Sequence, residues 1–98
     1  MIDEEIKISD NEFLRQFETR FNEQLASIEY SQQERKIFLT KVKMPEGTED
    51  HTEDFIKAVL EVIKDRNTRV VPTSPEIAGF IRKNRRKYKD LLPVGINI

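Results

Sequence analysis

The chain contains no cysteine and no tryptophan, and only one histidine and three glycines in 98 residues. The absence of cysteine excludes a disulfide framework, a thiolate metal site and a cysteine nucleophile, and it fits a reducing compartment. A single histidine excludes a multi-histidine centre, so we assign no metal ligands. No apolar run is long enough to span a bilayer, and the first five residues are acidic where a secretory signal would be basic. We therefore expect a cytoplasmic protein with no membrane anchor.

Composition and length indicate one small domain over residues 1–98. Hydrophobic residues make up 37% of the chain and charged residues 36%, which is enough apolar content for one modest core. The net charge of −1 hides an asymmetry, because residues 1–63 carry 8 basic against 15 acidic side chains, whereas residues 64–98 carry 9 against 3. This division can steer an acidic partner to the C-terminal part, or it can be two solvated faces that attract each other.

The first third of the chain has the pattern of a hairpin. Residues 11–21 contain phenylalanines spaced four apart, which fits a helix and also one face of a strand. The turn-like Asn22-Glu23 and the alternation of residues 25–30 favour two paired strands. Residues 1–9 read as a loose leader or an edge strand. All six phenylalanines are expected in the core: Phe13, Phe17, Phe21, Phe38, Phe55 and Phe80.

A polar connection at residues 31–35 leads to a third strand at residues 36–43. A helix is then predicted up to Asn67, because apolar residues recur at helical spacing, with Asp50 as N-cap and Asn67 as the left-handed end. A short apolar strand at residues 68–73 follows. Strand, helix and strand in this order imply a parallel pair joined by a right-handed crossover.

The C-terminal part begins a second helix at Ser74-Pro75, where serine is a favoured N-cap and proline a favoured first residue. Residues 84–92 add a helical turn that folds back through apolar side chains. Residues 93–98 are an extended tail. The elements together predict the α+β class: antiparallel strands, then a strand, helix and strand with a parallel pair, and two to three helices.

Three segments carry a family resemblance: Phe55-Ile56-Lys57-Ala58-Val59, Val70-Val71-Pro72-Thr73-Ser74-Pro75 and Tyr88-Lys89-Asp90-Leu91. In this order of elements, residues 11–92 resemble the small, YjdJ-like single-domain proteins of the GNAT superfamily of acetyl-CoA-dependent N-acetyltransferases. The resemblance implies a GNAT-like mixed sheet whose parallel pair splays apart. It also implies N-acetyltransferase activity, acetyl-CoA as cofactor, and a small-molecule or protein amine as substrate.

The same resemblance implies a site. In the family, acetyl-CoA lies between the two splayed strands, and a loop of the type Arg/Gln-x-x-Gly-x-Gly/Ala at the helix start holds its pyrophosphate. The implied cofactor contacts are Val42, Met44, Gly47, Thr48, Asp50 and Thr52. Ser74 stands where several relatives carry cysteine and is the implied catalytic residue. A helix cap is the competing interpretation of Ser74, and a pairing with His51 is a third.

The loop departs from the family pattern. Both motif glycines are replaced, by Asp50 and Thr52, and the leading basic or amide residue becomes Gly47. Four carboxylates crowd a helix end that carries about half a positive charge. They belong to Glu49, Asp50, Glu53 and Asp54. We therefore predict weak or absent coenzyme A binding.

A basic run near the C-terminus admits two interpretations. Its members are Arg82, Lys83, Arg85, Arg86, Lys87 and Lys89. It can contact phosphates of nucleic acid or of coenzyme A, but only Tyr88 is interleaved for stacking, and such runs are commonly solvated faces. The rivals to an acetyltransferase are therefore a non-catalytic binding module, which uses the cleft or this basic face, and a homodimer joined through an exposed strand edge.

Overall fold

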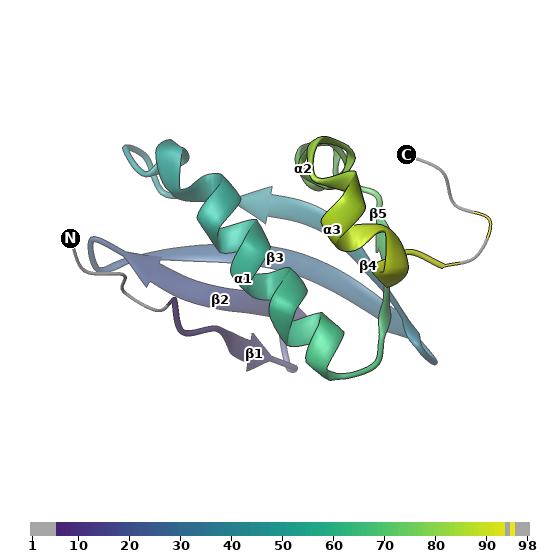
Figure 1. Cartoon of the computed structure of the whole chain (residues 1–98). Helices are drawn as coiled ribbons and strands as arrows, with labels where there is room; N and C mark the ends of the chain where they lie inside the picture. Colours follow the sequence, from purple (N-terminus) through teal and green to yellow (C-terminus); the bar gives the residue numbers. More distant parts are fainter. Residues whose placement is uncertain (1–5, 94, 96–98) are drawn as a thin grey trace.

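The computed structural model describes residues 6–93 and residue 95 as one sheet with helices packed against it (Figure 1). The elements in chain order are β1 (Ser9–Asn11), β2 (Gln16–Phe21), β3 (Gln24–Gln33), β4 (Lys36–Lys43), the 3-10 turn η1 (Glu49–His51), α1 (Thr52–Asp65), β5 (Arg69–Pro72), α2 (Pro75–Lys83), α3 (Arg85–Tyr88) and the 3-10 turn η2 (Lys89–Leu91). Within the described part of the chain, no helix is long and apolar enough to cross a bilayer.

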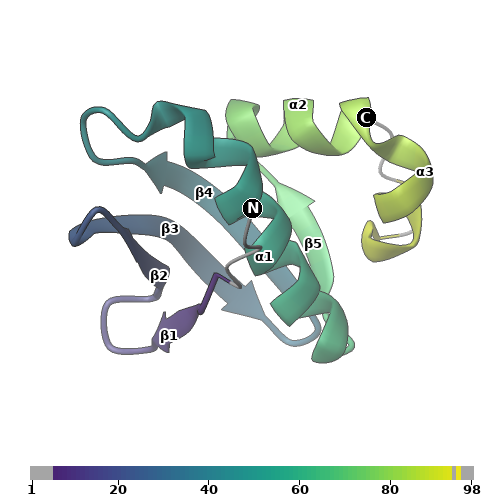
Figure 2. The ribbon, with the colours of Figure 1, turned by 60° about the vertical axis from the view of Figure 1, so that its left-hand side comes forward.

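The strands lie in the sheet in chain order, β1-β2-β3-β4-β5. Every neighbouring pair is antiparallel except β4 and β5, which are parallel. α1 makes the crossover between these two strands, and it lies across the sheet beside α2 (Figures 1 and 2). The predicted α+β class is confirmed, with antiparallel strands followed by a parallel pair and three helices.

The core lies between α1 and the sheet. The apolar stripe of α1 is buried as predicted and consists of Phe55, Ile56, Val59, Leu60 and Ile63. It packs in one cluster with inward side chains of the strands and of α2: Phe17, Ala26, Ile28, Ile37, Leu39, Val70, Ile77, Phe80 and Ile81. Full burial of one such side chain contributes roughly 1.5–3 kcal/mol, so this layer supplies the main driving force for folding.

The first hairpin differs from the prediction. β2 begins at Gln16, and the preceding residues form the turn that joins it to β1. The Asn11 side chain accepts a hydrogen bond from the N–H of Leu14 at 3.0 Å, and Arg15 has a positive φ of 57°, so the chain reverses here. Phe13, at the tip, is 93% exposed and is not a core residue. The sequence predicts a loose leader or an edge strand at residues 1–9, and an edge strand, β1, is observed from residue 9 onward.

Two further expectations about the strands are corrected. β3 continues through residues 31–33, where the sequence predicts a connection, and Glu34 takes the positive φ of 55° that lets a short turn replace it. Phe38 is half-buried but is not among the apolar side chains packed against the core. It lies on the other face of the sheet. Phe21 is half-buried and does pack against the core.

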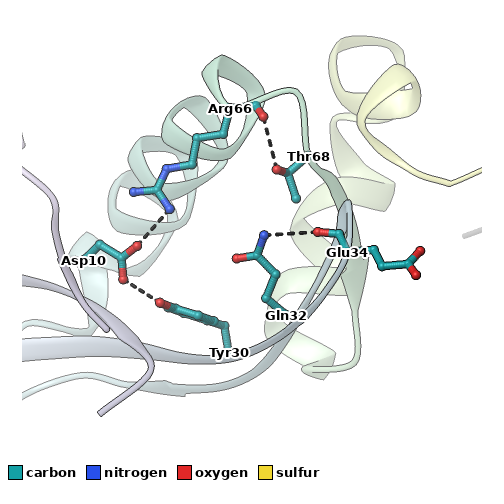
Figure 3. Close-up of polar contacts among 6 residues, drawn as sticks. All are labelled: Asp10, Tyr30, Gln32, Glu34, Arg66 and Thr68. Atoms are coloured by element: carbon teal, nitrogen blue, oxygen red, sulfur yellow. Dashed lines mark hydrogen bonds and ion pairs between the residues drawn. The ribbon is translucent and has the colours of Figure 1, made fainter. Parts of the chain in front are cut away.

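A polar network fastens β1 to the body of the protein (Figure 3). The Asp10 carboxylate accepts a hydrogen bond from the Tyr30 hydroxyl at 2.6 Å and, through its other oxygen, one from the Arg66 guanidinium at 2.8 Å. The same guanidinium lies 5.6 Å from the centre of the Phe17 ring. Burial and the hydrogen bond to Asp10 raise the pKa of Tyr30 to about 12. Strands β1 and β3 and the end of α1 therefore meet at one carboxylate.

The C-terminal part follows the sequence more closely. Asn67 has a positive φ of 54°, as predicted for the residue that ends α1. Tyr88, Leu91 and Leu92 are buried, which confirms that the last helical segment folds back on the core. The expected tail at residues 93–98 lies outside the described residues except for 93 and 95, and so do residues 1–5 of the leader.

Candidate functional site

The parallel pair β4 and β5 stays paired for only four residues and ends with Leu39 opposite Pro72. The Leu39 carbonyl oxygen then accepts hydrogen bonds from the N–H groups of Thr73 and Ser74 at 3.1 and 3.0 Å, and from the Thr73 hydroxyl at 3.0 Å. The chain next turns into α2, whereas β4 continues to Lys43 and is paired there with β3 alone among the described strands. The predicted splay of the two strands therefore begins at Leu39.

A β-bulge lies in β4 directly after this point. Leu39 is opposite Tyr30 and Lys41 is opposite Glu29, so Thr40 is one residue in excess on the β4 side. The Thr40 hydroxyl donates a hydrogen bond to the Glu29 carbonyl oxygen at 3.2 Å. Sequence analysis missed this bulge. Its signal is that two core-facing residues of β4, at positions 39 and 42, are three apart, which simple alternation does not allow.

The bulge sets the direction of the peptide groups that follow. Leu39 directs its carbonyl toward β5, and peptide groups along a strand alternate in direction, with the bulge adding one step. Val42 and, two residues on, Met44 therefore direct their N–H and C=O groups away from β3, toward the side that β5 has left. Their side chains pack against the core. The two predicted strand contacts thus share one backbone edge that no described strand covers.

The loop between β4 and α1 uses its own donors. Thr48 is fully buried and donates from its N–H and its hydroxyl to the Pro45 carbonyl oxygen, at 3.1 and 2.8 Å. The Thr48 carbonyl accepts a hydrogen bond from the N–H of His51 at 2.9 Å. Gly47 has a positive φ of 86°, which favours glycine, and donates its N–H to the Glu49 carboxylate at 3.1 Å. These backbone donors therefore point at groups of the loop itself.

Asp50 does not cap the helix, contrary to the sequence prediction. It lies in η1, and α1 begins only at Thr52, with His51 at the cap position and no side-chain capping bond. The 3-10 turn forms because both the N–H and the hydroxyl of Thr52 donate to the Glu49 carbonyl oxygen, the hydroxyl at 2.7 Å. The predicted loop contacts at residues 47, 48, 50 and 52 thus lie in one short segment, in which the Thr48 side chain is inaccessible.

Ser74 lies at the start of α2, beside the point where β4 and β5 part. It occupies the N-cap position, but its hydroxyl donates to the Glu76 carboxylate at 2.9 Å instead of accepting a bond from a helix amide. Ser74 is 1% exposed. The His51 ring stacks on the Phe21 ring of β2, with centroids 4.9 Å apart. The structure therefore gives Ser74 and His51 different partners and does not pair them.

The basic run lies on α2, α3 and η2, and all six side chains are exposed. Lys83 forms an ion pair with Glu53 of α1. The Lys87 ammonium lies 5.6 Å from the centre of the Tyr88 ring. Because Tyr88 is only 3% exposed, it offers no open ring face for stacking against a base.

Tyr88 holds a second feature that the sequence does not signal. Its hydroxyl is buried and has no hydrogen-bond partner among the described residues. Burial and the charge of Glu61 raise the pKa of Tyr88, and its ring packs against Phe80 at 5.7 Å. A buried hydroxyl without a partner costs about 1–3 kcal/mol, so this site reduces the stability of the C-terminal segment.

A surface depression of about 420 Å³ lies beside β2 and is lined in part by Phe21 and Leu25. Two strands, β3 and β4, separate β2 from β5 in the sheet. The depression is therefore distinct from the place where β4 and β5 part, and it does not belong to the predicted site.

A mixed sheet whose parallel pair parts at a β-bulge, with a loop and helix crossing between its strands, is consistent with a GNAT-like fold. The sequence profile of the GCN5-related N-acetyl-transferase family matches residues 16–91. The chain therefore belongs to the GCN5-related N-acetyltransferase (GNAT) family. The matched segment runs from the start of β2 to the end of η2. A comparison with curated protein sequences found no significant match.

Proposed function

We propose that this chain is an N-acetyltransferase domain. The end of β4, with Val42 and Met44, keeps one side of an acetyl-CoA site, but the Glu49 carboxylate closes the loop that would hold the pyrophosphate. The hydrogen bond from the Gly47 N–H to the Glu49 carboxylate carries the proposal. Acetyl-CoA accordingly binds weakly, with millimolar and not micromolar affinity. Acetyl transfer to a small-molecule or protein amine is slow for the same reason.

The strand side of the site fits an extended, amide-bearing arm. The peptide groups of Val42 and Met44 face the edge that β5 leaves. An extended chain can pair with them as β5 pairs with the first half of β4. Acetyl-CoA, when bound, would supply the activated acetyl group. The contribution of this chain would be to position the thioester and to donate a hydrogen bond from the strand amides to its carbonyl oxygen.

The loop side of the site does not fit a diphosphate. Helix N-termini bind phosphates because unpaired amides point at the ligand, and here the Gly47 amide is already bonded to Glu49. Two unit charges about 4 Å apart repel by about 1 kcal/mol in water and about 4 kcal/mol near a protein surface. Several carboxylates at this end therefore outweigh the half charge of the helix dipole. The family's leading basic or amide position is occupied by Gly47.

Ser74 stays the predicted catalytic residue. Its position beside the splay supports the assignment, whereas its burial and its bond to Glu76 mean that the hydroxyl must be released before it can react. Intact-protein mass spectrometry after incubation with acetyl-CoA tests this directly. An acetyl adduct that is absent from Ser74→Ala would establish a covalent role.

Titration calorimetry with acetyl-CoA tests the proposal as a gain of function. Wild type should give no saturable heat at micromolar ligand, and Glu49→Ala should bind about tenfold more tightly because both the charge and the acceptor of the Gly47 N–H leave the loop. The combined variant Glu49→Ala, Asp50→Gly, Thr52→Gly should bind more tightly still. Asp65→Asn removes one negative charge at the other end of α1 and should change nothing. Micromolar binding to wild type would overturn the proposal.

A non-catalytic binding module is the second candidate function. It is favoured by the exposure of all six side chains of the basic run, of which only Lys83 forms an ion pair with a described residue. On this reading the fold of an acetyltransferase is reused to present a basic face to an anionic partner.

A further inference from the structure

The outer face of the sheet, opposite the helices, carries no described element. α1 and α2 pack together on the other face, and the strands lie behind α1 in both views (Figures 1 and 2). The side chains of β4 show the same division. Ile37 and Leu39 are buried in the core, whereas Lys36, Lys41 and Lys43 are exposed.

Two apolar side chains lie side by side on this outer face. Phe38 is opposite Val71 in the parallel register, both are half-buried, and neither packs against the core. On its other side Phe38 is opposite Ser31 of β3, which is exposed. Parallel strands are normally covered on both faces, so a ring that no described helix covers on such a pair is unusual. The exposed part of the Phe38 ring is therefore available to a partner.

Lysines flank this ring along β4. Lys36 precedes Phe38 by two residues, and Lys41 and Lys43 follow it after the bulge. The nearby Glu29 carboxylate lies 2.7 Å from the Lys43 ammonium. The hydrogen bond from Lys43 and the charges of Lys43 and Lys41 hold the pKa of Glu29 below its ordinary value. Glu29 therefore offsets part of the charge of Lys41 and Lys43, whereas Lys36 is opposite Gln33, so a positive surplus remains beside the ring.

The charge and the ring together select the partner. A second copy bound through this face about a twofold axis would bring the same lysines against each other. An acidic peptide would satisfy the lysines but not the ring. Single-stranded nucleic acid satisfies both, because bases stack on aromatic side chains while the backbone phosphates follow cationic ones. We propose that the outer sheet face centred on Phe38 binds single-stranded nucleic acid.

Fluorescence anisotropy with a labelled oligouridylate of about 15 nucleotides tests this proposal. Phe38→Leu keeps the apolar volume but removes the ring, and it should weaken binding about fivefold or more. Lys41→Gln should make the negative slope of log K against log salt less steep by about 0.7, the value of one phosphate contact on a single strand. Lys57→Gln makes the same charge change on the exposed surface of α1 and should have no effect. The double variant Arg85→Gln, Arg86→Gln should also bind as wild type does.

The outcomes are separable. Weaker binding by Phe38→Leu with an unchanged circular dichroism spectrum supports the proposal. It is overturned if wild type gives no anisotropy change or if Phe38→Leu binds as tightly as wild type. It is also overturned if Lys57→Gln changes the salt dependence of binding as much as Lys41→Gln does. Loss of binding only in the Arg85 and Arg86 double variant would place the interaction on the basic run instead. Competition by polyglutamate as effective as unlabelled oligouridylate would show an acidic protein surface to be the partner.

Discussion

Replacing Asp10 by alanine should destabilise the whole domain, although Asp10 lies in a strand of three residues at the edge of the sheet. The Asp10 carboxylate is bonded both to the Tyr30 hydroxyl and to the Arg66 guanidinium, and its side chain is only 12% exposed (Figure 3). Alanine at this position removes the acceptor of both bonds. It leaves the Tyr30 hydroxyl half-buried without its partner.

The magnitude follows from the exposure of each partner. A hydrogen bond to a charged group contributes about 1.5–3 kcal/mol, and the bond from half-buried Tyr30 belongs in that range. The Arg66 side chain is 43% exposed, so its ion pair contributes only about 0.5 kcal/mol. The expected loss is therefore about 2–3.5 kcal/mol. For a domain of this size it corresponds to a fall in Tm of roughly 8–28 °C.

Thermal and urea unfolding followed by circular dichroism measure this loss, and a double-mutant cycle with Tyr30→Phe isolates the bond. The two single losses should not add, with a coupling of about 1 kcal/mol or more. Glu12→Ala, in the exposed turn next to β1, is the matched control and should unfold as wild type does. Additive losses, or a loss in Asp10→Ala no larger than that of the control, would refute the reasoning.

The same network predicts a dependence on alkaline pH. The pKa of Tyr30 is raised from 10.0 to about 12, so the folded state favours the protonated hydroxyl. This contribution is complete below pH 10 and is lost as the pH rises toward 12. The pKa of Tyr88 is raised as well, so Tyr30→Phe should reduce the alkaline loss of stability without abolishing it. An unchanged profile in Tyr30→Phe would contradict the assignment.

Two further predictions concern the C-terminal segment. Tyr88→Phe removes a buried hydroxyl that has no described partner. It should raise the free energy of unfolding by about 1 kcal/mol and Tm by roughly 4–8 °C. A lower Tm would mean that the hydroxyl is hydrogen-bonded in solution. The double variant Arg85→Glu, Arg86→Glu tests the second candidate function and should elute from immobilised heparin at lower salt than Lys64→Glu, which reverses one charge at the end of α1. Identical elution of the two would count against the basic face.

The helical part of the fold could be predicted because its signals are local. The apolar stripe of α1 has a spacing that only a helix buries on one side, and Asn67 marks its end by tolerating a positive φ. The first hairpin could not be predicted in the same way, since phenylalanines four apart fit a helix and a strand equally. Asn11 decides the matter by accepting the N–H of Leu14, which starts a turn and leaves Phe13 in solvent.

The candidate site, like the fold, could be predicted from the sequence only in part. The family resemblance predicts Val42 and Met44 as contacts, and the structure places both beyond the bulge at the end of β4. The bulge at Thr40 could not be predicted, because it depends on how β3 and β4 are offset once both are packed. The start of α1 also escapes prediction, because the buried Thr48 and the 3-10 turn after it move the helix past Asp50.

The proposed closure of the loop depends on one tethered side chain, that of Glu49. Glu49 stands two residues from the Gly47 amide, so its carboxylate reaches that donor at a high effective concentration, whereas a phosphate must be bound from solution. The shape of the loop is set elsewhere, by the buried Thr48 and its two bonds to Pro45. Exchanging Glu49 therefore releases the amide without unfolding the loop. On the proposed function, a single substitution here should therefore change anion affinity while β4 and β5 stay as they are.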